Sequence, residues 1–397
     1  MWNDILSECL KAFGLFFLHP MLYVFLLVSL IIGYIRVKKE RKNFSFRIYN
    51  AKYEIITSIW NGLLVGLVFS IVTLGIGVMV PVQLLYVIEI ITILVMFTLQ
   101  TQWMSSAYLV GISLFLLTLV PSSKMPSQFQ DFIGHAKAIH FQSITILVGL
   151  LLLMEGILIQ LNASKKSNPL LEESKRGKKI GAHSVKRLWL VPLFLLIPTG
   201  PITSDFHWWP VLHIGQTSYS VVLVPFSIGF YQLVRGSIAN QTIKMIGRQI
   251  CLLSIFILVG GALSFYNDII AYATLALAIV GRELITFLQK NSDANSPAIF
   301  TSRERGLVVL GILPDSPAEK MDVHVGETIT KVNGQIIKSI TEFYEALQIN
   351  RAYCKLEVID LNAQIRITQG AVYEGQHHEL GFLFVEDAKE LIGKIPG

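Results

Sequence analysis

Long apolar runs fill the first 290 residues of the chain, and short runs that alternate apolar with polar residues follow them. A run of about 20 apolar residues is long enough to cross roughly 30 Å of hydrocarbon as a helix. The pattern predicts a polytopic transmembrane region over residues 1–289, a polar linker at 290–297 and a soluble module at 298–397. The candidate spans are 15–35, 60–80, 84–99, 107–120, 141–161, 188–202, 211–234, 250–266 and 269–288.

Two of these runs, 107–120 and 188–202, are shorter than the others, and a tilted or half-crossing path would suit them. The run at 188–202 also contains proline, which interrupts helices. The expected fold is a membrane α-helical bundle of about eight to nine spans, followed by a small α+β domain.

The charge pattern predicts which side of the membrane each loop occupies. Charged residues make up only 15% of the chain, against roughly 25% in a soluble domain. Basic residues gather in the loops 36–54 and 162–187, with a smaller group at 235–248. These loops fall on one side if the N-terminus is outside, so the positive-inside rule places the C-terminal module in the cytoplasm. Such loops are also attracted to anionic lipid, and no nucleic-acid partner is expected.

The sequence offers no pattern for catalysis or metal binding. Cys9, Cys251 and Cys354 lie far apart and form neither a disulfide framework nor a CxxC site, as suits a reducing cytoplasm. An HExxH zinc motif and a GxSxG nucleophile motif are both missing. We therefore expect no enzyme, no metal, no cofactor and no small-molecule substrate.

Ionisable side chains stand inside several predicted spans, namely Glu89, Glu155 and the pair Arg282 and Glu283. A charge in hydrocarbon is costly, so each is a functional candidate by default. Two interpretations are open: hydrogen bonding between helices, or a proton-coupled pathway through Glu89 and Glu155. The residues follow no motif of fixed spacing, which favours the first interpretation.

The C-terminal module has the alternation of a small α+β domain. Apolar, β-branched runs bounded by Pro, Asn and Gly indicate strands and turns, and Asn followed by Gly is the strongest short hairpin signal. The predicted elements are a strand at 306–312, a short helix after Ser316, a strand at 328–332, a hairpin turn at Asn333 and Gly334, a helix at 341–347 and two strands between 354 and 368.

This order of elements resembles the PDZ domain, in the form attached to bacterial membrane proteins and HtrA-type proteases. The resemblance rests on RGLVV at 305–309, PDSPA at 314–318, GETI at 326–329 and VNG at 332–334. Met321 and Asp322 stand where family members carry Ala and Gly, and Glu327 replaces an Asp. These departures affect the expected binding specificity more than the fold.

A PDZ domain accepts an extended peptide as an extra strand at an open sheet edge. The resemblance implies that the loop before the first strand binds a peptide carboxylate, that the first strand is the docking edge, and that the helix is the opposite wall. An alternative stays open, because an apolar stripe in this strand and helix is equally typical of core residues. The residues implied for the groove are Arg305, Gly306, Leu307, Val308, Val309, Phe343, Ala346 and Leu347.

The whole arrangement, with about eight spans, two basic loops and one C-terminal PDZ-like module, is similar to the MinJ family. The resemblance implies a membrane adaptor for division-site selection, which bridges the polar and septal scaffold DivIVA to the MinD ATPase so that the division inhibitor MinC acts at poles and septa. It also implies a multi-pass protein of the cell membrane, enriched at septa and poles, with a cytoplasmic PDZ domain.

Two other classes of function remain as alternatives. One is a membrane transporter with a regulatory PDZ module, and the other is a non-catalytic PDZ regulator of a membrane protease. The sequence also leaves open which surface contacts which partner, and whether the groove takes a C-terminus, an internal segment or nothing.

Overall fold

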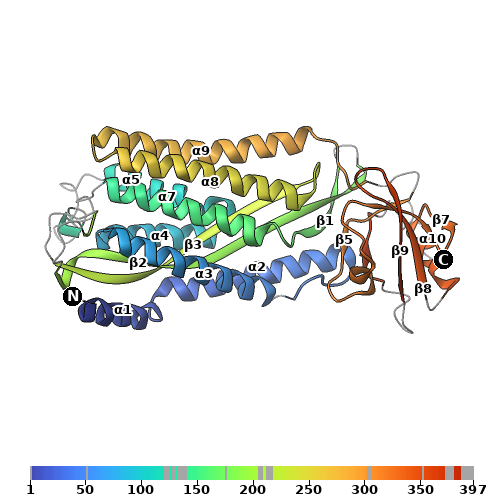
Figure 1. Ribbon diagram of the computed structural model, residues 1–397, viewed down its shortest axis with the longest axis horizontal. Helices are drawn as coiled ribbons and strands as arrows, with labels where there is room; N and C mark the ends of the chain where they lie inside the picture. The colour runs from blue at the N-terminus through green and yellow to red at the C-terminus, as the bar shows by residue number, and fades with distance from the viewer. Residues whose placement is uncertain are drawn as a thin grey trace.

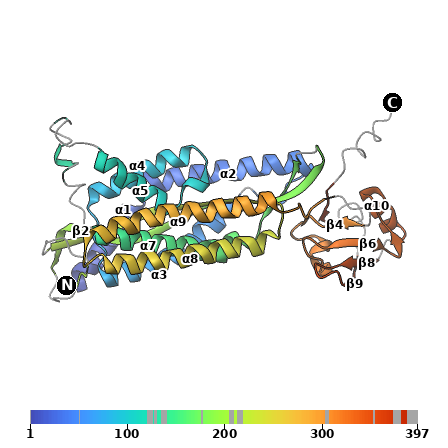
Figure 2. The same ribbon diagram turned by 90° about the horizontal axis from the view of Figure 1, so that it is seen from above.

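The computed structural model describes residues 2–50, 52–119, 126, 130–132, 134, 141–174, 177–203, 209–211, 218–301, 306–350, 353–371 and 380–385. The molecule is elongated, with the N-terminus at one end of a long bundle and the C-terminal module at the other end (Figure 1). The view turned by 90° shows the same two parts joined end to end (Figure 2).

Five helices among the described residues are long and apolar enough to cross a membrane, and two shorter apolar helices accompany them. Large exposed apolar side chains such as Leu67 and Ile71 lie along them, as a lipid-facing surface requires. The helices of the bundle are α1 (Trp2–Phe16), α2 (Pro20–Phe44), α3 (Lys52–Ile76), α4 (Val82–Phe97), the 3-10 turn η1 (Thr101–Trp103), α5 (Ser106–Leu119), α7 (Phe141–Leu158) with its π-helical extension η3 (Ile159–Ala163), α8 (Ala239–Leu263) and α9 (Asp268–Asn295).

Two of the predicted helical spans are wrong. Residues 188–202 and most of 211–234 lie in two long strands, β2 (Lys179–Thr203) and β3 (Ser218–Val234), which pair antiparallel. An apolar run does not by itself distinguish a strand from a helix. Pro192 and Pro225, which stand opposite each other in the register, would each break a helix. The expected count of eight to nine helical spans is therefore not confirmed.

Two further boundaries differ from the prediction. The first predicted span, 15–35, contains a break between α1 and α2, where Pro20 begins the second helix. Helix α9 continues to Asn295 and thus occupies most of the predicted linker 290–297. A short strand, β1 (Asn168–Glu173), pairs with the start of β2 inside the second basic loop.

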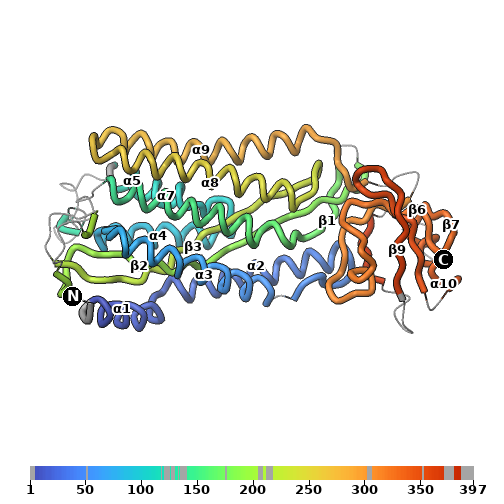
Figure 3. Tube along the Cα trace, viewed as in Figure 1, coloured from blue at the N-terminus to red at the C-terminus, as the bar shows by residue number. Residues whose placement is uncertain are grey.

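The β2–β3 hairpin runs lengthwise through the bundle, beside α3 (Figure 3). Helix α3 approaches β2 so closely because Gly62 and Gly66 face it one turn apart. A Cβ at Gly62 would stand 2.0 Å from the carbonyl oxygen of Leu190, and one at Gly66 would stand 2.5 Å from that of Pro192. Only glycine permits this contact between helix and strand backbone.

The next turns of α3 complete the hydrogen bonding of that strand edge. Ser70 Oγ donates to the carbonyl of Pro192 at 3.4 Å and accepts the N–H of Phe194 at 3.1 Å. Thr73 Oγ1 donates to the carbonyl of Phe194 at 2.7 Å. Pro192 has no N–H, so this edge also has one donor fewer to satisfy.

The outer edge of β3 is bonded by the turn between α4 and α5. The N–H of Gly229 donates to the carbonyl of Met104 at 2.9 Å, and Thr101 Oγ1 donates to the carbonyl of Phe230 at 3.1 Å. Lipid offers no hydrogen-bond partners, so non-helical backbone at membrane depth has to be satisfied by protein in this way. The hairpin is tolerated because both of its edges are covered.

The C-terminal module has the predicted order of elements. Asn333 and Gly334 both have positive φ, 48° and 86°, as the hairpin turn requires. The cap of the helix is Ser339, whose Oγ accepts the N–H of Glu342 at 3.1 Å. The elements are β4 (Leu307–Val308), β5 (Gly311–Ile312), η4 (Pro317–Met321), β6 (Thr328–Val332), β7 (Gln335–Ile336), α10 (Ile340–Gln348), β8 (Tyr353–Ile359), β9 (Ile365–Ala371) and β10 (Phe382–Leu383).

One sheet has the order β4-β6-β8-β9 with β7 beside β6, and β10 pairs antiparallel with β5. The last described strand of the chain therefore returns to β5, the second strand of the module.

We expect Gly66→Val to destabilise the protein by about 3 kcal/mol, because the new side chain would collide with the backbone of β2. Thermal unfolding of the purified protein in detergent would measure this loss. Gly75→Val on the same helix is the matched control, since nothing lies within 4 Å of a Cβ there. Equal effects of the two substitutions would contradict the close approach of α3 to β2.

Candidate peptide-binding groove

Strand β10 and the two residues after it belong to two different apolar clusters. Phe382 points into the core of the module, where its ring lies 6.2 Å from that of Phe343. Leu383 and Val385 pack in a separate cluster with Ile48, which lies in the loop between α2 and α3. The strand is thus shared between the module and the membrane region.

The first strand segment of the module is divided in the same way. Leu307 and Val309 belong to the core of the module, whereas Val308 and Leu310 belong to the cluster with Ile48. Successive side chains of a strand point to opposite faces, so this segment also joins the two parts of the molecule.

One edge of β10 is paired with β5, and the other edge pairs with no strand among the residues that the structure describes. The carbonyl of Gly381 accepts the N–H of Leu313 at 2.8 Å, and that of Leu383 accepts the N–H of Leu310 at 2.7 Å. Because successive residues alternate their backbone groups between the two edges, the N–H and C=O of Phe382 point away from β5. Gly381, the residue before β10, has a φ of +98°, a conformation that favours glycine.

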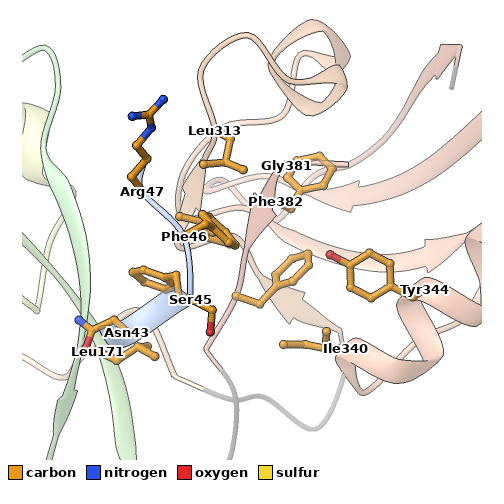
Figure 4. A pocket seen from close by; sticks show the side chains of 13 residues that line it. Asn43, Ser45, Phe46, Arg47, Leu171, Leu313, Ile340, Tyr344, Gly381 and Phe382 are labelled. Atoms are coloured by element: carbon orange, nitrogen blue, oxygen red, sulfur yellow. The ribbon is translucent and has the colours of Figure 1, made fainter. Parts of the chain in front are cut away.

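A cavity of about 420 Å³ lies along this strand. Ile340 and Tyr344 of α10 lie on one side of β10, and the α2–α3 loop passes on the other side with Phe46 beside Phe382 (Figure 4). An open strand edge next to a helix and a cavity is the geometry that binds an extended peptide as an added strand. The residues that line the cavity are Asn43, Phe44, Ser45, Phe46, Arg47, Leu171, Leu313, Ile340, Tyr344, Gly381, Phe382, Leu383 and Phe384.

Of the residues that the sequence predicts for a groove, those that the structure describes do not line this cavity. Leu307 and Val308 pair with Ile329 and Thr328 of β6, so this edge of the segment is occupied. Gly306 has a φ of +86° and packs against β6, where a Cβ would stand 2.5 Å from a carbonyl oxygen. Arg305 lies outside the described residues.

The predicted helical wall is buried in the core of the module. Phe343, Ala346 and Leu347 are 0%, 4% and 2% exposed and pack with Val309 and Ile329. The alternative interpretation of the apolar stripe as core residues agrees with this placement. The exposed face of the same helix, with Ile340 and Tyr344, is the part that lines the cavity.

Sequence reasoning missed the segment 380–385, which carries the open edge. Its signal is a glycine inside a short apolar run, with Leu380 before Gly381 and Phe382 after it. Glycine in a strand pattern indicates a bulge or a close approach. That signal lies at the far end of the module from the motifs that resemble a PDZ domain, so nothing local linked it to the helix at 340–348.

The α2–α3 loop beside the cavity is anchored by a buried ionic cluster. Glu54 on α3 accepts from Arg36 on α2 at 3.0 Å and from Arg187 on β2 at 2.7 Å. The ring of Tyr49 stacks on Tyr53 at 5.1 Å and lies 5.6 Å from the Arg36 guanidinium. Burial raises the pKa of the Tyr49 phenol to about 12, so this side chain stays neutral at any physiological pH.

Comparison with known proteins identifies both parts of the chain. A family model for the PDZ domain matches residues 308–358. The cell division topological determinant MinJ of Bacillus subtilis (strain 168) is 40% identical over 383 residues, which cover 96% of each chain. The chain belongs to the MinJ family. Two proteins named as probable cell division topological determinants MinJ, from Lacticaseibacillus paracasei and Lacticaseibacillus casei (strain BD-II), are each 24% identical over 89% of this chain and 92% of their own.

The buried carboxylates of the membrane region are paired with other side chains. Glu155 on α7 is fully buried, pairs with Arg282 of α9 at 2.9 Å and accepts from Ser105 Oγ at 2.6 Å. Glu89 on α4 lies 3.0 Å from His19 in the break between α1 and α2. Each carboxylate therefore has a partner on another segment, which favours interhelical bonding over a transport pathway.

The described residues of this MinJ family member contain no group of three or more His, Cys, Asp or Glu side chains that could hold a metal ion. A division determinant with a PDZ domain suggests a role in protein contacts rather than in chemistry.

We expect Arg282→Leu alone to destabilise the protein by about 3–5 kcal/mol, because it leaves the Glu155 carboxylate buried without its partner. The double variant Glu155→Leu with Arg282→Leu removes both charges and should regain most of that stability. Thermal unfolding in lipid nanodiscs would compare the two. A double variant as unstable as the single one would show that the pair is not coupled.

Proposed function

We propose that this protein is a membrane adaptor for division-site selection, which bridges a DivIVA-like scaffold to the MinD ATPase so that MinC acts at poles and septa. The observation that carries the proposal is the open edge of β10 beside α10, a surface for binding a peptide of another protein. The division role named for the relatives supports the choice of pathway.

The charge pattern supports a cytoplasmic placement of the PDZ domain. Arg41 and Lys42 lie in the last turn of α2, and the basic segments 162–187 and 235–248 begin or end at the same end of the bundle as the PDZ domain (Figure 1). Basic residues favour the cytoplasmic side. The scaffold and the ATPase would then meet a groove held against the membrane surface.

We expect this chain, fused to a fluorescent protein at its C-terminus and produced in B. subtilis that lacks its own MinJ, to concentrate at septa and poles. Labelled MinD should follow it there. Tyr344→Ala, which truncates the wall of the groove, should spread MinD over the membrane, whereas Ile336→Ala on the exposed β7 should not. Fluorescence of the unaltered chain that ignores septa would contradict the proposal.

A further inference from the structure

The cavity beside β10 is built from both parts of the molecule. One wall is α10 of the PDZ domain, and the other is residues 43–47, which are the end of α2 and the start of the α2–α3 loop. Figure 4 shows the loop passing along β10, with Phe46 beside Phe382 and Arg47 extended from the same segment. The volume of about 420 Å³ falls within the roughly 300–1,000 Å³ of ligand-binding sites, so space remains between the two walls.

The loop is held in a fixed conformation before any ligand arrives. Ser45 ends α2 in the left-handed region with a φ of 66°. Glu40 Oε2 accepts the N–H groups of Ile48 at 2.8 Å and Tyr49 at 3.4 Å, and Arg36 donates to the carbonyl of Asn50 at 2.7 Å. A wall anchored in this way costs a ligand little ordering entropy.

The charge of this wall selects the chemistry of the ligand. The buried cluster below it balances Arg36 and Arg187 against Glu40 and Glu54. Arg47 is exposed and has no ion pair among the residues that the structure describes. Arg47 lines the cavity, so it gives the cavity a positive charge, to which a carboxylate is complementary.

We propose that this groove is a composite site, in which an extended acidic peptide of a partner protein lies between β10 and the α2–α3 loop. The peptide adds a strand to the Phe382 edge, its apolar side chains enter the cavity under Phe46, and one of its carboxylates pairs with Arg47. The inference rests on the proposed adaptor function only in that the groove binds a protein partner. In a composite site, peptide binding depends on the membrane region, because the PDZ domain alone lacks the wall formed by the α2–α3 loop.

The test uses the full chain in nanodiscs of zwitterionic lipid, which lack the negative charge that would compete for Arg47. The probe is a fluorescein-labelled octapeptide of glutamate, valine and phenylalanine with a free C-terminus, followed by fluorescence anisotropy. A second peptide with lysine in place of glutamate is the control for charge. We expect the acidic peptide to bind at least tenfold more tightly than the lysine peptide, and its affinity to fall as salt is raised.

Two variants test the loop. Arg47→Glu should weaken the acidic peptide roughly fivefold or more, the size of an exposed charge pair that is lost and reversed. Phe46→Ala should weaken it roughly fivefold to tenfold through lost apolar contact. Arg41→Glu is the matched control, because it makes the same charge change on the exposed end of α2 without lining the cavity, and it should change affinity less than twofold. All three positions are exposed, so folding should persist, and thermal unfolding would verify it.

Several results would overturn the composite site. A gain of affinity in Phe46→Ala would mean that the loop blocks the groove, and unchanged affinity in both loop variants would mean that the PDZ domain binds alone. If the unaltered chain did not bind the acidic peptide, that result would also contradict the inference. Septal localisation is measured separately, so a chain that reaches the septum but fails these tests would retain the adaptor function and lose only the composite site.

Discussion

The hydrogen bonding of the β2–β3 hairpin is the constraint on which the rest of the bundle depends. A strand edge inside hydrocarbon is unstable unless protein groups bond it, and here helix α3 and the α4–α5 turn do so. The demand explains why α3 presents Gly62, Gly66, Ser70 and Thr73 on one face. Small residues bring the helix to the strand, and hydroxyls then bond its backbone. The same demand places Thr101 and Met104 beside β3.

The hairpin also contributes one residue to a buried ionic cluster that involves α2 and α3. Arg187 on β2 and Arg36 on α2 share the Glu54 carboxylate of α3, so three segments distant in sequence are joined by one buried anion. Such a cluster contributes little net stability but strongly disfavours other packings, because any rearrangement leaves a buried charge without its partner. We interpret the cluster as the device that sets the position of the α2–α3 loop.

That loop connects the membrane region to the PDZ domain. Ile48 packs with Val308, Leu310, Leu383 and Val385, which are the outward faces of the two strand segments whose inward faces form the PDZ core. The module is therefore docked through the strands that build it rather than through a separate surface. An orientation fixed in this way holds the candidate groove at one end of the bundle.

The sequence by itself determined the features that depend on local chemistry. Apolar length identified a membrane region, and Asn333 with Gly334 specified a turn whose positive φ values only such residues adopt readily. The same local logic identified the PDZ-like order of elements. It was wrong for residues 188–202 and 211–234, because an apolar run with prolines satisfies either a broken helix or a strand. The strand conformation is favoured because α3 and η1 supply hydrogen-bond partners for its backbone.

The position of the candidate groove likewise depends on tertiary structure. The first strand of the module looked like a docking edge, but β6 occupies Leu307 and Val308. The open edge belongs to Phe382, a residue about 70 positions further along, and it forms because β10 returns to pair with β5. The sequence does not indicate which distant strands will pair. Each strand has the same alternation of apolar and polar residues whichever strand it pairs with.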